Sequence, residues 1–136
     1  MGALDGIRVI AVEQAVAAPF CSSRLADAGA EVIKIERPEG DFARGYDAAA
    51  KGQSSYFVWL NRGKQSAVVD LATKEGCAEL EKLIASADVL IQNLKPGSMD
   101  KLGFSRERAA EGLSEADFLH DHRLWRRRSL RASQGL

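Results

Sequence analysis

The sequence predicts an α/β fold in which a mostly parallel sheet is flanked by helices. Short apolar runs at 7–12, 31–36, 66–71 and 88–92 have the density of buried strands. Helix-start signals or helical spacing occur between the first and second of these runs and between the third and fourth. Strands that alternate with helices in this way form parallel sheets with right-handed crossovers.

The first helix is predicted to run from Pro19 to about residue 28. Proline is favoured at the first position of a helix, where its missing N–H is not needed. Residues 13–18 before it form a turn of small residues. Gly29 suits the left-handed residue that ends a helix.

The second strand, at 31–36, ends on charged residues although most of it is apolar. Pro38 prevents further ladder pairing. Ligands of open α/β sheets bind at the carboxyl ends of strands, which makes Arg37 a candidate anion anchor. The alternative is that Arg37 is a solvated strand-end charge. Residues 37–55 form a long polar connection, and connections of this length are usually functional or disordered.

The second half of the chain continues the alternation. Residues 56–60 are aromatic and apolar and precede a turn. Thr73 is predicted to cap a helix whose apolar residues recur at helical spacing, which makes Cys77 a core residue. A short helix is expected around 99–102, and Ser105 is expected to cap a further one.

Composition describes an ordinary globular chain. Its 136 residues, 46% of them hydrophobic and 28% charged, are enough for one domain with a core. No apolar run reaches membrane-spanning length, and the N-terminus does not resemble a signal peptide. Cys21 and Cys77 have no metal-ligand spacing. We therefore expect a cytoplasmic protein with no metal and no membrane association.

Common nucleotide-binding motifs and the serine-nucleophile motif of hydrolases are absent from the sequence. No G-x-G-x-x-G follows the first strand, and there is no P-loop or nucleophile elbow. The small residues Ala17 and Ala18 either let a phosphate or thioester approach a helix N-terminus or merely allow close packing. Some polar residues in turns or after strands can meet phosphates or remain solvated. They are Lys64, Asn93, Lys95 and Lys101.

Five blocks of sequence, in order, resemble the N-terminal part of class III CoA-transferases, a family that includes α-methylacyl-CoA racemase. The blocks are GIRVIAVEQAVAAPF, LADAGAEVIKIERPEGDFARG, SSYFVWLNRGKQSAVVDL, ADVLIQN and KPGSMDKLGF. The resemblance covers about residues 4–111. It implies that residues 1–111 are a Rossmann-like CoA-binding domain. The sheet is then incomplete (truncated), because family members are roughly three times this length and form interlocked homodimers.

The resemblance also implies a set of CoA-binding positions. They are Val16 and Ala17 beside the thioester, Arg37 near the adenine nucleotide, Val69, Asp70, Leu71 and Ala72 along the CoA groove, Asn93, Leu94 and Lys95 in a second lining segment, and Lys101 near a phosphate. Two positions depart from formyl-CoA transferase. Val16 replaces a glutamine, so formyl or oxalyl specificity is not implied, and Ala72 replaces a lysine that contacts phosphate.

The mechanism that the resemblance implies is covalent transfer through an aspartate, between acyl-CoA and a carboxylate acceptor. That aspartate is expected beyond residue 136, so none of these residues is assigned a catalytic role and the chain as written is expected to be inactive. Two alternatives remain open. One is a stand-alone CoA-binding or regulatory module, and the other is a fragment of a racemase-like enzyme.

Residues 112–136 do not continue the family pattern. Residues 118–131 fit neither strand nor helix spacing, and residues 119–136 carry a net charge of +4 against −4 for the rest. Reading one base forward from the codon of Leu113, with permitted synonymous codons, gives SPRLTSFTTIGYGEDGPYARAKAY, which is close to the family's next strand and glycine-rich loop. We therefore predict a frameshifted, non-native basic tail. The rival interpretation, a basic arm for nucleic acid, is less favoured.

Overall fold

The computed structural model describes residues 1–105 and the backbone of residues 117–120. Its centre is a parallel sheet with the strand order β3-β2-β1-β4-β5. The strands are β1 (Arg8–Val12), β2 (Glu31–Glu36), β3 (Gln65–Val68), β4 (Val89–Gln92) and β5 (Asp117–His120). The prediction of a parallel α/β sheet flanked by helices is confirmed.

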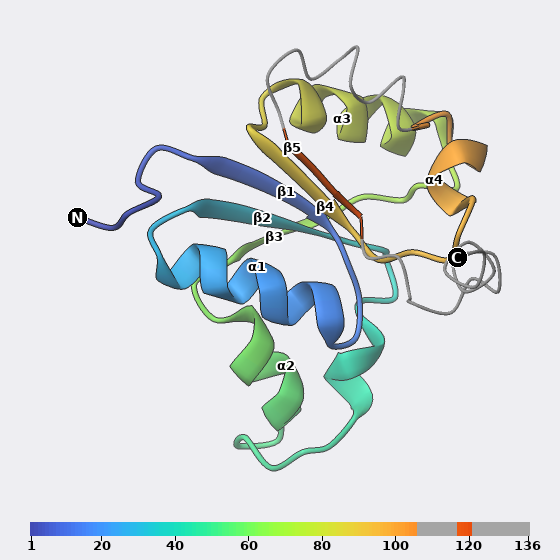
Figure 1. The fold of residues 1–136 in the computed structure, drawn as a ribbon. Coiled ribbons are helices and arrows are strands. Elements are labelled where there is room, and N and C mark those ends of the chain that lie inside the picture. The colour runs from blue at the N-terminus through green and yellow to red at the C-terminus, as the bar shows by residue number, and fades with distance from the viewer. Residues whose placement is uncertain (106–116, 121–136) are drawn as a thin grey trace, which may run out of the picture.

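Helices cover both faces of this sheet (Figure 1). They are α1 (Ala17–Asp27), the 3-10 helix η1 (Phe42–Gly45), α2 (Ser55–Asn61), α3 (Lys74–Ala85) and α4 (Ser98–Lys101). In Figure 1, α1 and α2 lie on one side of the sheet, and α3 and α4 lie on the other. None of the helices in the described part of the chain is both long and apolar enough to cross a membrane.

Alternating side chains of the strands enter two hydrophobic cores. Val9, Ala11 and Val32 pack with Ala18 beneath α1. Ile10, Val12, Ile35 and Leu90 face the opposite way and pack against Leu80 and Ile84 of α3. Cys77 is partly buried against this second core, as its helical position predicted. Burial on both faces explains why these strands are almost continuously apolar.

Two helices differ from the prediction: α1 begins earlier than expected, and α2 was not predicted. Helix α1 begins at Ala17, two residues before the predicted start, because a proline is tolerated throughout the first helical turn. Residues 55–61 form α2, which begins where the Ser54 hydroxyl accepts a hydrogen bond from the Phe57 N–H at 3.3 Å. The carboxylate of Asp47 closes the preceding loop by accepting hydrogen bonds from the Ser55 N–H and hydroxyl, each at 2.8 Å.

The third strand ends earlier than predicted. β3 stops at Val68, whereas the apolar run suggested a strand to residue 71. The reason is the turn at Asp70, whose carboxylate accepts a hydrogen bond from the Ala72 N–H at 3.0 Å. Residues 69–72 therefore leave the sheet and reach the edge where the other parallel strands end.

Part of the segment 118–131, whose residues fit neither strand nor helix spacing, belongs to a strand in the structure. Residues 117–120 form β5, which pairs in parallel with β4 at the edge of the sheet. Ladder hydrogen bonds join backbone groups, so an edge strand can form without the alternation expected of buried strands. The helix expected after Ser105 and the remainder of the tail lie outside the described residues.

Candidate functional site

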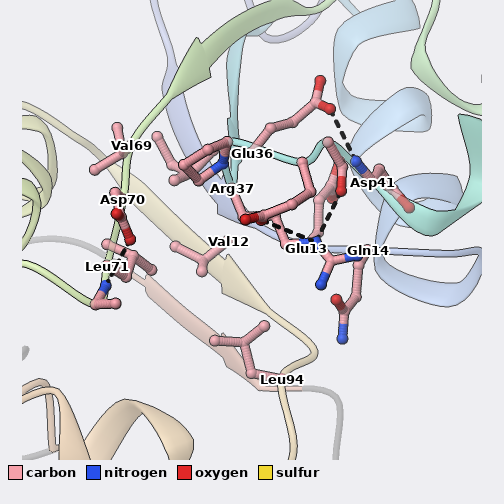
Figure 2. Close-up of a pocket in the computed structure, with 15 residues that line it drawn as sticks. Val12, Glu13, Gln14, Glu36, Arg37, Asp41, Val69, Asp70, Leu71 and Leu94 are labelled. Atoms are coloured by element: carbon pink, nitrogen blue, oxygen red, sulfur yellow. Dashed lines mark hydrogen bonds and ion pairs between the residues drawn. The ribbon is translucent and has the colours of Figure 1, made fainter.

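A cleft of about 310 Å³ lies at the carboxyl ends of the parallel strands. It is lined by residues 12–14 at the end of β1, 35–41 at the end of β2, 69–72 after β3, and Leu94 after β4. Figure 2 shows Gln14 and Asp41 on one side of the cleft and Val69, Asp70 and Leu71 on the other.

The order of the strands explains why a cleft forms here. Adjacent strands β1 and β4 lead to helices on opposite faces of the sheet, α1 and α4. The segments that leave them therefore diverge, and this switch point is where open α/β sheets bind ligands. Gln14 follows β1 and Leu94 follows β4, so both stand at the switch point.

The structure brings six of the eleven predicted CoA-binding residues together. Arg37, Val69, Asp70, Leu71, Ala72 and Leu94 all line the cleft. Lys101 lies in a neighbouring cleft of about 430 Å³, which shares Leu71 and Ala72 with the first. Val16, Ala17, Asn93 and Lys95 are in the lining of neither cleft.

Arg37 is about half-exposed and has local partners. Its guanidinium stacks on the Phe42 ring, with 3.9 Å from Cζ to the ring centroid. Its Nε donates a hydrogen bond to the Gly40 carbonyl at 2.9 Å. These contacts hold a cation at the rim of the cleft, where Arg37 can meet an anionic ligand.

Asn93 contacts the chain rather than the cleft. Its Oδ1 accepts a hydrogen bond from the Gln14 N–H at 2.9 Å, and its Nδ2 donates one to the Gln14 carbonyl at 2.8 Å. Both backbone groups of Gln14 are thereby satisfied by one side chain. Asn93 thus fixes the start of the β1–α1 turn, which we define as residues 14–16.

Beside the cleft lies a buried group of charges that the sequence analysis missed. Glu13, Lys34, Asp41 and Lys64 form this ionic cluster, and each of the four side chains is at most 2% exposed. Lys34 Nζ lies 2.8 Å from Asp41 Oδ2, and Lys64 Nζ lies 2.7 Å from Glu13 Oε1. Two acids and two bases balance, as buried charges require.

The Lys64 side chain is buried, with 2% of its surface exposed, so the interpretation that it remains solvated is wrong. Its ammonium donates hydrogen bonds to Glu13, to the Pro19 carbonyl at 2.9 Å and to Asn61 Oδ1 at 3.1 Å. Burial lowers the pKa of the Lys64 amine, and the charge of Glu13 opposes that shift. Two of its acceptors, on Glu13 and Pro19, are distant in sequence, and periodicity could not indicate them.

A second buried carboxylate, Glu36, sits at the cleft end of β2 with 2% of its side chain exposed. Arg44 binds it in bidentate fashion, with Nη2 2.7 Å from Oε1 and Nε 2.8 Å from Oε2. These hydrogen bonds, assisted by Ser66 and the Asp41 N–H, lower the pKa of Glu36 from 4.5 to about 2, although burial opposes the shift.

Acid should therefore weaken the fold through Glu36. Because its pKa is lower in the folded than in the unfolded state, its stabilisation is fully present above about pH 4.5 and is lost as pH falls toward 2. We expect Arg44→Gln to cost on the order of 1–2 kcal/mol at pH 7, since solvent around the half-exposed arginine screens part of the interaction.

The measurement is urea unfolding at pH 7 and pH 3. The parent chain should lose more free energy of unfolding between these values than Arg44→Gln does. The control is Arg24→Gln, which removes an exposed pair with Asp27 and should keep the parent's pH dependence. An equal pH dependence in Arg44→Gln and the parent would contradict the assignment.

The described residues contain no group of three or more His, Cys, Asp or Glu side chains that could hold a metal ion. Residues 4–112 match the family model described as CoA-transferase family III. The chain belongs to CoA-transferase family III.

Relatives in CoA-transferase family III are similar over the same region. The chain is 40% identical over 116 residues to the succinyl-CoA:mesaconate CoA-transferase of Haloarcula hispanica, covering 82% of this chain and 29% of that protein. It is 41% identical over 111 residues to the formyl-CoA:oxalate CoA-transferase of Rhodopseudomonas palustris, covering 80% of this chain and 26% of that protein.

Solved structures agree with the family III assignment. The hypothetical protein Rv3272 from Mycobacterium tuberculosis matches with a TM-score of 0.82 and 36% identity, over 88% of this chain and 33% of that one. A CAIB/BAIF family protein from Brucella suis matches with a TM-score of 0.81 and 35% identity, over 88% of this chain and 33% of that one. The chain thus spans less than a third of the length of the curated relatives and about a third of these structures, and matches their N-terminal part.

Proposed function

We propose that this chain is the CoA-binding portion of a CoA-transferase that moves CoA from an acyl-CoA to a carboxylate. The observation that carries this proposal is the cleft at the switch point of the sheet, which gathers six of the eleven residues implied by the family resemblance. The names of the relatives, which act on succinyl-CoA or formyl-CoA and on mesaconate or oxalate, support the substrate class.

The lining fits a ligand that is anionic at one end and apolar along its length. Arg37 offers a cation at the rim. Val69, Leu71 and Leu94 offer apolar contact along the wall and floor. The neighbouring cleft adds Lys74 and Lys101, and both clefts share the wall at residues 71–72. A nucleotide with several phosphates and a long pantetheine arm matches this distribution of charge and apolar surface.

The covalent step is assigned to the complete protein. An aspartate carboxylate attacks the thioester carbonyl and forms a mixed anhydride as the CoA thiolate leaves. The thiolate then attacks the aspartyl carbonyl, which releases the donor carboxylate and gives an aspartyl-CoA thioester. The acceptor carboxylate displaces CoA to form a second anhydride, and the thiolate attacks its acceptor carbonyl, which gives the new acyl-CoA and frees the aspartate. We place that aspartate C-terminal to residue 136, and we expect family members to act as homodimers. Asp41 and Glu36 in this cleft are held in buried ion pairs, which leaves neither suited to be the nucleophile.

We further propose that residues 112–136 are translated from a shifted frame. The family match ends at residue 112, which supports this proposal. Sequencing the coding DNA around Gly112 tests it: an extra or missing base that restores a glycine-rich GYGEDGPY segment confirms the shift. A verified frame without one favours a stand-alone CoA-binding module instead.

The binding proposal is tested by titrating CoA into the 136-residue chain in a calorimeter. Arg37→Ala should weaken CoA binding about tenfold, the scale of one charge-assisted contact to a phosphate. The matched control is Arg62→Ala, which removes an exposed arginine paired with Asp27 and should leave affinity unchanged. Absence of CoA binding by the parent, or equal affinity in both variants, overturns the assignment.

The rival function is tested with the same protein. A basic arm predicts binding of duplex DNA that weakens steeply with salt and disappears when residues 119–136 are deleted. We expect no such binding, and CoA affinity that survives the deletion.

A further inference from the structure

We propose that Asp41 is a positioning residue, which holds the β1–α1 turn (residues 14–16) in the shape that receives the acyl-thioester arm of CoA. The inference rests on the proposed function, because the resemblance places the thioester beside Val16 and Ala17. It goes beyond that function by naming a residue on a different strand connection as the group that shapes this end of the site.

The first observation is a strained backbone in the turn. Ala15 has a φ of 64°, a left-handed conformation that side chains other than glycine rarely adopt. Such a conformation is strained and persists only where surrounding contacts enforce it. The turn therefore needs holding groups, and the structure supplies them on both sides of Ala15.

One holding group is Asn93, which binds both backbone groups of Gln14. The other is Asp41, whose Oδ1 accepts a hydrogen bond from the Ala15 N–H at 2.9 Å. The same oxygen accepts the Ala43 N–H at 2.9 Å and so caps η1. Asp41 thus ties the turn after β1 to the connection after β2.

The second oxygen of Asp41 fixes the carboxylate itself. Oδ2 lies 2.8 Å from Lys34 Nζ, and both side chains are 1% exposed. Lys34 also lies 3.5 Å from Glu13, the residue immediately before the turn. A buried ion pair with so little solvent has few alternative arrangements, so Asp41 presents Oδ1 to Ala15 in one orientation.

The hydrogen bond from Ala15 to Asp41 affects the shape of the cleft because both segments border it. Asp41 and Gln14 both line the cleft, and the turn leads directly into α1, whose N-cap residue Val16 makes no capping hydrogen bond through its side chain. If Asp41 releases Ala15, the turn can relax to an ordinary φ and carry Gln14 and Val16 with it. The nucleotide end of the site, at Arg37 and residues 69–72, has no direct bond to Ala15.

The experiment compares two ligands on the 136-residue chain: adenosine 3′,5′-bisphosphate, which is the nucleotide end alone, and butyryl-CoA. The measured quantity is the affinity for butyryl-CoA divided by the affinity for the bisphosphate, in the parent, in Asp41→Ala and in Asp41→Asn. We expect Asp41→Ala to lower the ratio about tenfold, the scale of a hydrogen bond to a charged group, with bisphosphate affinity within about twofold of the parent. Asp41→Asn keeps an oxygen acceptor and should restore most of the ratio.

A merely structural role would lower both affinities together, so an unchanged ratio in Asp41→Ala overturns the proposal while leaving CoA binding intact. Failure of the parent to bind either ligand overturns the proposed function and this inference with it. If Asp41→Ala does not fold, amide hydrogen exchange on the parent tests instead whether the turn at Ala15 is held in place. We expect the Ala15 amide to be protected without ligand, and exchange as fast as at an open loop overturns the proposal.

Discussion

Replacing Lys34 with methionine should cost about 3–5 kcal/mol of unfolding free energy, the range found when one partner of a buried ion pair is removed. Methionine fills similar volume, so the loss reflects charge rather than a cavity. Asp41 would remain inside the protein without its cation, as each side chain is 1% exposed. For a chain of this size, that is a large share of total stability.

Urea unfolding measures this effect, and a second variant identifies its cause. Lys34→Met combined with Asp41→Asn removes both charges and should recover most of the lost free energy, because no uncompensated carboxylate remains. The control is Lys82→Met, at an exposed position of α3, which should change stability by less than about 0.5 kcal/mol. A double variant no more stable than the single one would refute the charge explanation.

The second large effect is expected at Gly76, in the first turn of α3. Glycine to alanine in a helix ordinarily stabilises by about 1 kcal/mol. Here a Cβ would stand 1.9 Å from the Asp70 carbonyl oxygen, and backbone cannot move aside as a flexible side chain can. We expect Gly76→Ala to destabilise instead, by about 1–3 kcal/mol, and to weaken CoA binding because Asp70 belongs to the cleft lining at 69–72.

Thermal unfolding and CoA titration measure the two consequences at Gly76. The matched control is Gly45→Ala, where an added Cβ meets nothing within 4 Å, and it should bind CoA as the parent does. A Gly76→Ala variant with the usual helix stabilisation and unchanged affinity would contradict the predicted clash.

The strands were the most predictable part of the molecule because their signal is local. β2 has the predicted bounds, and β1 and β4 differ from prediction by one residue at one end. Helix α2 could not be predicted in this way, since its start depends on the Ser54 cap and on Asp47 closing the preceding loop. Neither contact leaves a periodic pattern in the sequence.

The candidate site likewise contains residues that the sequence predicted and residues that it did not. Residues 69–72 were predicted from the family resemblance and Arg37 also from its place at the end of a strand, and all of them line the cleft. The ionic cluster was missed because its four members come from four segments, and Lys34 alone looks like a charge at the end of a strand. Asn93 was predicted from the resemblance as part of a lining segment, and the structure adds that its amide holds the Gln14 backbone. A sequence pattern marks a position but not the direction of a side chain.

The strand order also constrains when the sheet can assemble. β1 is the first strand in the chain but lies inside the sheet, with β2 on one side and β4 on the other. Its pairing with β4 joins Val9 to Val89, so the second side of β1 stays unsatisfied until nearly the whole domain has been synthesised. Pairings this distant in sequence form slowly. Until β4 pairs with it, β1 has an unpaired apolar edge that can associate with other chains. The position that protects β1 in the finished protein is therefore the one that exposes it longest during synthesis.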